Sequence, residues 1–266
     1  MRIIRLFRVI SILFILFLIL SYIDDNYNNV PDKIVDNFIN LKNSDEDLSN
    51  LQNIIDNTYA EGVIVYDVKN NKILGQKNID RVYSLASLTK IVTGYLVYEQ
   101  DKTKLNDIRN MMKTSDNREA EKLTDVFNMY HQDKISYINY RVSKYNLFFR
   151  NASGLDIKDV NGNRIAGGQG KPIDIIYFIK DYYNKYPEIF DQTIVESKDN
   201  TNIIVKDLKF LTGGKTGYTD LSGGNLFVSV QKGLGRDIFI LVLNSTEKNR
   251  FVDVQNIADF LVKSNI

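Results

Sequence analysis

The stretch that decides the fold is YSLASLTKIVT, residues 83–93 of this 266-residue chain. It places Ser87 and Lys90 three positions apart, so in a helix the hydroxyl and the amine project from one face and can meet. From Leu88 to Tyr98 the apolar residues recur at the intervals of a largely buried helix. We therefore expect a nucleophile and a candidate base at the beginning of a buried helix.

The segments on either side of this helix predict an α+β fold. Upstream, residues 62–66 and 72–74 have β-type composition around a polar turn, which is typical of a hairpin. Residues 105–186 are helical in period, apart from a glycine-rich loop at 154–172. In the last third, predicted strands cover residues 203–205, 224–230 and 237–243, and an amphipathic helix covers residues 251–262. This order favours α+β over alternating βαβ units.

The N-terminus differs from the rest of the chain. Residues 9–23 are apolar apart from two serines, arginines precede them and two aspartates follow. By the positive-inside rule the arginines stay in the cytoplasm, which places everything after Ile23 outside. The run is short for a membrane span, but no small-residue cleavage pattern follows it. Residues 1–23 are therefore expected to be an uncleaved anchor in the cell membrane, and the protein is secreted if this segment is cleaved.

Two further segments follow this predicted anchor. Residues 24–59 are rich in Asn and Asp, with apolar residues at helical spacing. They predict a polar helical stalk, with a helix packed on the domain as the alternative. Residues 60–266 are expected to form one domain, because no internal repeat or low-complexity block divides them.

The composition excludes several kinds of chemistry. The chain has no cysteine, which excludes disulfides, thiolate nucleophiles and thiolate metal sites. Its one histidine, His131, lies in a polar stretch, so a His-rich zinc site is excluded and an imidazole base is disfavoured. A Ser-Lys pair is the remaining well-known arrangement for a serine hydrolase. With a net charge of +1 we expect no nucleic-acid partner, and no metal or cofactor.

Two other short motifs raise the Ser-x-x-Lys pattern above chance. Ser115-Asp116-Asn117 lies at a predicted helix break, and Lys215-Thr216-Gly217 lies on a predicted strand after two glycines. Penicillin-binding proteins and class A β-lactamases carry these three motifs in this order. Three motifs in order, on elements of the expected type, are much more specific than one.

The likeness extends beyond these motifs, from about residue 62 to residue 261. The matching segments are residues 85–93, 111–120, 149–156, 200–202, 213–219 and 249–251. Together they resemble the low-molecular-mass penicillin-binding proteins, the serine-type D-alanyl-D-alanine carboxypeptidases. The resemblance implies an antiparallel β-sheet flanked by helices, with a helical subdomain. It also implies peptidoglycan stem peptides as substrates and β-lactams as inhibitors.

The resemblance assigns the catalytic roles to three residues. Ser87 would attack the carbonyl of the D-Ala-D-Ala bond and form an acyl-enzyme. Lys90 would take the serine proton, which requires its neutral form; burial and a second cation, Lys215, would both favour that form. Ser115 would pass the proton to the leaving amine.

The remaining assignments concern substrate binding. Asn117 would hold the substrate amide, and Lys215 and Thr216 would bind the terminal carboxylate. The strand through Gly217 and Tyr218 would pair with the extended substrate. The backbone N–H groups of Ser87 and Tyr218 would form the oxyanion hole.

The spacing between the first two motifs is a departure from the family. Ser115 follows Ser87 by 28 positions (115 − 87), which is shorter than most of the family has. We therefore expect one side of the cleft to be more open.

Three alternatives to a carboxypeptidase remain at the level of sequence. A β-lactamase would need a deacylating carboxylate, but the chain has no Glu-x-x-Leu-Asn sequence. A D,D-endopeptidase acting on peptidoglycan cross-links would use the same catalytic residues. A degenerate, non-catalytic penicillin-binding-like module is favoured by the short first half and disfavoured by the complete motif set.

Overall fold

The computed structural model describes the backbone of residues 32–128 and 133–266, and the side chains from residue 44 onward within these ranges. The described chain falls into two units. The first contains residues up to Glu46 together with Asn265, and the second contains residues 47–264 together with Ile266. Helix α2 (Asp32–Asp56) contributes to both units. The predicted anchor and His131 lie outside the described residues.

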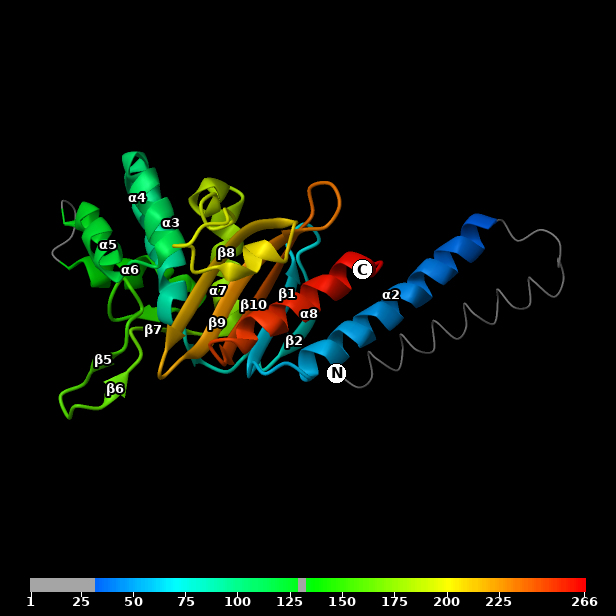
Figure 1. Ribbon diagram of the computed structural model, residues 1–266, viewed down its shortest axis with the longest axis horizontal. Helices are drawn as coiled ribbons and strands as arrows, with labels where there is room; N and C mark the ends of the chain where they lie inside the picture. The colour runs from blue at the N-terminus through cyan, green and yellow to red at the C-terminus, as the bar shows by residue number, and fades with distance from the viewer. Residues whose placement is uncertain (1–31, 129–132) are drawn as a thin grey trace. The chain divides into compact units, whose positions relative to one another are not determined.

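A five-stranded antiparallel sheet forms the centre of the second unit (Figure 1). Its strand order is β2-β1-β10-β9-β8, which leaves β8 at an edge. The strands are β1 (Gly62–Asp67), β2 (Lys72–Lys77), β8 (Leu211–Thr219), β9 (Gly223–Gln231) and β10 (Asp237–Ser245). The predicted hairpin is confirmed, because β1 pairs with β2, with an irregularity between Val65 and Tyr66.

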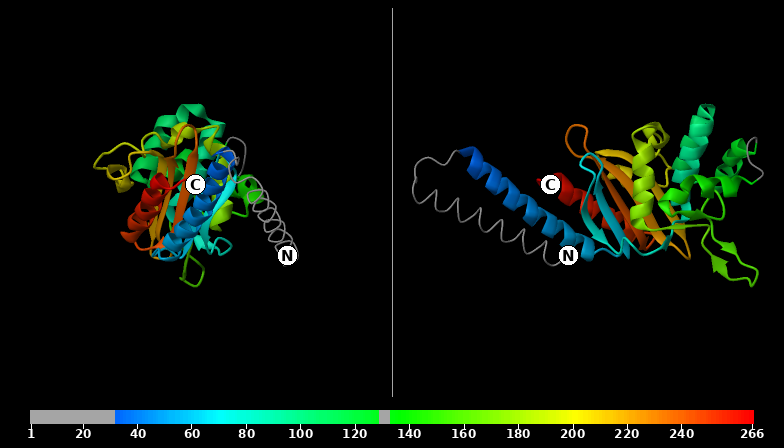
Figure 2. Two further views of the ribbon diagram at one scale, coloured as in Figure 1. Left: turned by 90° about the vertical axis from the view of Figure 1, so that its right-hand side faces the viewer. Right: turned by 180° about the vertical axis from the view of Figure 1, so that it is seen from behind.

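Helices cover both faces of this sheet, and the right-hand view of Figure 2 shows the face that is turned away from the viewer in Figure 1. Helices α3 (Thr89–Gln100) and α7 (Pro172–Tyr183) lie on one face, and α8 (Asn249–Lys263) lies on the other. Helices α4 (Leu105–Thr114), α5 (Asn117–Leu123) and α6 (Lys134–Val142) complete the helical part of the unit. Five short strands complete the unit: β3 (Tyr83–Ser84), β4 (Phe148–Phe149), β7 (Gly168–Gly170), and β5 (Ile157–Lys158) paired with β6 (Arg164–Ile165). The predicted α+β class is confirmed.

Side chains that alternate along the strands divide the interior into two cores, as the period of a β-strand requires. Tyr66 and Phe239 point into the core that contains α3 and α7. Their chain neighbours Val65 and Ile240 point into the other core, which contains α8. Because the sheet is covered on both faces, β10 reads as a nearly continuous apolar run.

The end of α2 belongs to this compact unit. Leu51 and Ile55, one helical turn apart, are fully buried in the core on the α8 face. Gln52 also donates from its side chain to the carbonyl of Gln76 at 2.8 Å. The packed-helix alternative thus describes residues 47–56, and the compact unit begins about a dozen residues before the expected boundary at residue 60.

One further expectation, a strand over residues 203–205, can be compared with the described structure. These residues lie instead in a 3-10 helix (Ile203–Lys206), where the Ile204 carbonyl accepts locally from the backbone N–H groups of Asp207 and Leu208. Within the described ranges, no helix combines the length and the apolar character needed to cross a membrane.

Candidate active site

Ser87 lies in the short 3-10 helix Ala86–Leu88 that leads into α3. Ala86, directly before it, has φ +46°, a left-handed conformation that costs a non-glycine residue about 1 kcal/mol or more. Buried neighbours hold this conformation: a Cβ added to Gly154 would lie 1.8 Å from the Ala86 carbonyl oxygen. Gly154 itself has φ +80°. The turn that presents Ser87 is therefore fixed by close contact with the 151–154 loop.

Lys90 is the second residue of α3, is fully buried, and contacts three oxygen atoms. Its Nζ is 2.8 Å from Ser87 Oγ, 2.7 Å from Asn117 Oδ1 and 2.8 Å from the carbonyl oxygen of Ser153. Burial lowers the pKa of Lys90 to about 7, although the carboxylates of Glu121 and Asp116 raise it. Near neutral pH a large share of the amine is therefore uncharged.

The three contacts also orient the neutral amine. A neutral lysine has two N–H donors and one lone pair. Two of the contacts, Asn117 Oδ1 and the Ser153 carbonyl, are oxygen atoms that can only accept, so they take the two N–H groups. The lone pair is then left for the hydroxyl proton of Ser87, at 2.8 Å. This is the geometry that a general base for Ser87 requires.

The second motif lies between α4 and α5. Ser115 ends α4 in a left-handed conformation, with φ +59°, and Asp116 caps α5 by accepting from the backbone N–H groups of Arg118 and Glu119. This sharp change of direction brings Ser115 to Lys215 and Asn117 to Lys90. Lys215 Nζ donates to Ser115 Oγ at 2.9 Å.

The third motif lies on β8, at the edge of the sheet. Lys215 is buried, and its Nζ also donates to the Thr216 carbonyl at 2.8 Å. Burial lowers its pKa well below the usual range, and the charges of Lys90 and Arg250 add to this effect. The predicted repulsion between the two lysines thus lowers the pKa of Lys215, whereas the pKa of Lys90 is lowered by burial.

The hydroxyl of Thr216 is part of a chain of hydrogen bonds. Thr201 Oγ1 has one proton, which goes to the Lys113 carbonyl at 3.1 Å. It therefore accepts from Thr216 Oγ1, at 2.7 Å, rather than donating to it. In this structure the Thr216 proton is consequently directed toward Thr201.

Gly217 and Tyr218 lie beside the nucleophile. A Cβ at Gly217 would lie 3.0 Å from the Leu85 carbonyl oxygen and 3.2 Å from Ser87 N, so glycine permits the close approach of β8. Buried Arg250 of α8 donates to the Gly217 carbonyl at 2.6 Å. The following residue, Tyr218, is 46% exposed. The two groups proposed for the oxyanion hole, Ser87 N and Tyr218 N, thus lie on adjoining segments.

The structure brings together residues from all three motifs, and it adds others. Ser153 and Arg250 lie in segments that carried the resemblance, so the sequence had marked their position but not their contacts. Thr201 was likewise part of the quoted segment 200–202. Glu121 carried no signal, because a glutamate four positions after Asn117 on a helix is most often a solvated side chain.

The 28 positions between Ser87 and Ser115 contain α3, the 3-10 turn Lys102–Lys104 and α4. The more open cleft expected on this side stays a prediction.

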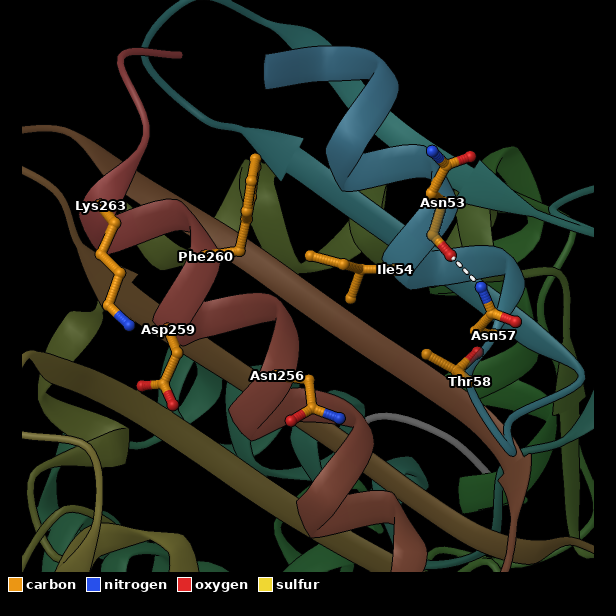
Figure 3. Close-up of a pocket in the computed structure, with 8 residues that line it drawn as sticks. All are labelled: Asn53, Ile54, Asn57, Thr58, Asn256, Asp259, Phe260 and Lys263. Carbon is orange, nitrogen blue, oxygen red and sulfur yellow. Dashed lines mark hydrogen bonds between the residues drawn. The ribbon is translucent and has the colours of Figure 1, made fainter. Parts of the chain in front are cut away.

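A separate groove of about 540 Å³ lies between the end of α2 and α8 (Figure 3). Its lining residues are Asn53, Ile54, Asn57, Thr58, Asn256, Asp259, Phe260 and Lys263. None of the residues of the three motifs lines this groove, so it is distinct from the site at Ser87.

Several known proteins are similar to this chain. Residues 50–140 match the family model of D-alanyl-D-alanine carboxypeptidases. The predicted resemblance to this family is confirmed. The D-alanyl-D-alanine carboxypeptidase match contains the first two motifs, and Lys215 lies beyond it. A D-alanyl-D-alanine endopeptidase of Haemophilus influenzae is 24% identical over 231 residues, covering 70% of this chain and 76% of that relative.

Solved structures extend the likeness over a larger share of the chain. Penicillin-binding protein D2 of Listeria monocytogenes, in its ampicillin-bound form, has a TM-score of 0.66 and 24% identity, covering 77% of this chain and 98% of that one. Penicillin-binding protein 6B of Escherichia coli has a TM-score of 0.62 and 17% identity, covering 76% and 77% of the two chains. These likenesses show that the chain has the fold of the penicillin-binding proteins.

Proposed function

We propose that this protein is a serine-type D-Ala-D-Ala carboxypeptidase that acts on peptidoglycan stem peptides through an acyl-enzyme on Ser87. The observation that carries the proposal is the environment of Lys90. Its amine is buried, its pKa is about 7, and two carbonyl oxygens direct its remaining lone pair at the Ser87 hydroxyl. The family match and the fold agree with this reaction class.

In the acylation step, Lys90 Nζ takes the proton of Ser87 Oγ as this oxygen bonds to the substrate carbonyl carbon. The N–H groups of Ser87 and Tyr218 stabilise the resulting oxyanion, a contribution of about 3 to 4 kcal/mol for one donor. Ser115 gives its proton to the leaving nitrogen, and the C–N bond breaks. The proton held by Lys90 then restores Ser115.

In the deacylation step, Lys90 is neutral again and activates a water that attacks the ester carbon. The ester bond to Ser87 Oγ breaks, and the proton returns to this oxygen through Lys90. Asn117 presents its amide N–H groups to the substrate, since its Oδ1 accepts from Lys90. Lys215, next to Thr216 at the edge strand, supplies the cation for a terminal carboxylate.

A labelling experiment tests the first step. Purified protein is incubated with a fluorescent penicillin, and the labelled residue is identified by mass spectrometry. We expect one label, on Ser87, and none on Ser87→Ala. D-alanine release from a stem pentapeptide is measured in parallel. Intact, folded protein that is neither labelled nor active would overturn the proposal and leave the non-catalytic module as the explanation.

One observation favours D,D-endopeptidase activity as a second candidate. The Thr216 hydroxyl proton is directed toward Thr201. A substrate whose free carboxylate accepts from this hydroxyl has to break the Thr216–Thr201 hydrogen bond. A substrate with an amide at that position does not need to break it. The related protein from H. influenzae is named an endopeptidase. Digestion of cross-linked dimers and of pentapeptides, followed by mass spectrometry, separates the two activities by their products.

For the location of this activity, we propose a cell membrane anchor formed by residues 1–23, with the catalytic domain on the extracytoplasmic side. The support is the apolar run of residues 9–23 with arginines before it. Penicillin labelling of membrane and soluble fractions tests this. Label found only in the culture medium would show instead that the segment is cleaved.

A further inference from the structure

The loop that supplies the Ser153 carbonyl to Lys90 is held by one carboxylate. Glu121 Oε1 accepts from the backbone N–H groups of Ala152 and Ser153, both at 3.1 Å. On the other side of the loop, Thr93 of α3 donates to the Ala152 carbonyl at 2.7 Å. The peptide groups around Ser153 are thus fixed at one end by Glu121 and at the other by Lys90.

Glu121 reaches this position from α5. It follows Asn117 by four positions, so the two side chains leave one face of the helix. Asn117 contacts Lys90 directly, and Glu121 contacts it through the peptide group of Ser153. One helix face therefore supports both of the acceptors that hold the amine.

We propose that Glu121 is a positioning residue, which fixes the Ser153 carbonyl against Lys90 and places a negative charge beside this base. The inference rests on the proposed function, since it assigns Lys90 the role of base. The Glu121 carboxylate contributes in two ways. Its two hydrogen bonds hold the loop that carries the Ser153 carbonyl. Its negative charge raises the Lys90 pKa and so opposes the lowering of that pKa by burial.

The charges around Lys90 agree with this assignment. Among them, the Glu121 carboxylate makes the largest contribution that raises the Lys90 pKa, followed by Asp116 at the cap of the same helix. From β8, the neighbouring basic group is Lys215, whose own pKa is lowered well below the usual range by burial. From α6, Lys134 donates to the Glu121 carbonyl at 3.1 Å but pairs with the carboxylate of Asp125.

The experiment compares Glu121→Gln with the wild type. Glutamine keeps a side-chain oxygen that accepts both loop N–H groups, but it removes the charge. The Lys90 pKa should fall, and the acidic limb of the acylation rate should move to lower pH by roughly one unit, the lower end of what a neighbouring opposite charge does. Glu119→Gln is the matched control, because Glu119 lies on the same helix and pairs with Lys122.

Two readouts keep this test separate from the proposed function. Acylation by penicillin reports the rate, and NMR titration of 13C-labelled lysine reports the Lys90 pKa whether or not the protein is acylated. If penicillin does not label the wild type but the Lys90 pKa falls in Glu121→Gln, the proposed function is refuted and the electrostatic role of Glu121 is retained. A Lys90 pKa that is the same in wild type, Glu121→Gln and Glu119→Gln would overturn the inference.

Glu121→Ala completes the design, because it removes the hydrogen bonds as well as the charge. We expect its acylation rate on the high-pH plateau to fall at least about tenfold, while Glu121→Gln keeps most of the plateau, since a misplaced base slows proton transfer. Equal plateau rates in both variants would show that the Ser153 carbonyl needs no support from Glu121.

Discussion

The pH dependence of acylation follows directly from the burial of Lys90. Its pKa is about 7, and the base has to be neutral to accept the Ser87 proton. The rate should therefore rise with pH, pass its midpoint near pH 7 and then level off. Between pH 6 and pH 8 the neutral fraction goes from about one tenth to about nine tenths, so we expect a rise of about tenfold.

An exposed lysine would behave differently. With the usual pKa of about 10.4, only about one amine in two to three thousand is neutral at pH 7, and the rate rises about a hundredfold from pH 6 to pH 8 without levelling off. The two cases thus differ about tenfold in this interval and in the shape of the curve. Burial of the amine in α3, with three acceptors, is the physical reason for the difference.

The assay is the first-order acylation constant at saturating fluorescent penicillin, followed by stopped flow from about pH 5 to pH 9.5. At saturation we expect the bound carboxylate to keep Lys215 charged, so that the titration of Lys90 is observed. Spontaneous penicillin hydrolysis at each pH is subtracted. A rate that rises by a factor of ten per pH unit up to pH 9 would refute the burial argument, even if Ser87 is the residue labelled.

Two other predictions concern the supports of the site. Gly154→Ala should abolish labelling, because its Cβ would lie 1.8 Å from the Ala86 carbonyl oxygen. The control Gly162→Ala has the same φ of +80° but open space around it, so it should lose only about 1 kcal/mol of stability. Labelling retained in both variants would contradict this. Asp253→Asn should lower the free energy of unfolding by about 1 to 3 kcal/mol, because buried Asp253 accepts the backbone N–H groups of residues 59 and 60. Urea denaturation beside the exposed control Asp259→Asn checks this, and equal midpoints would argue against it.

The sequence predicted most of what has a regular period or a local pattern. The buried helix after Ser87, the first hairpin, and the strands and final helix of the last third are present, because alternation and helical spacing are properties of the chain itself. The strand predicted over residues 203–205 was wrong, since three apolar residues do not distinguish a short strand from a 3-10 turn. The end of α2 showed only helical spacing, which does not say whether its apolar face is covered.

By itself, the sequence determined which residue types carry the chemistry and in what order they follow. The absence of cysteine, the single histidine and the three motifs indicated a serine and a lysine as the reacting pair. Only the tertiary structure decided the surroundings that suit the lysine to the proposed role of base. Asn117, Ser153 and Glu121 come from segments far from α3 in the chain, and they bury, orient and electrostatically tune one amine. Such effects depend on distance and solvent exclusion, which the spacing of residues in a sequence does not contain.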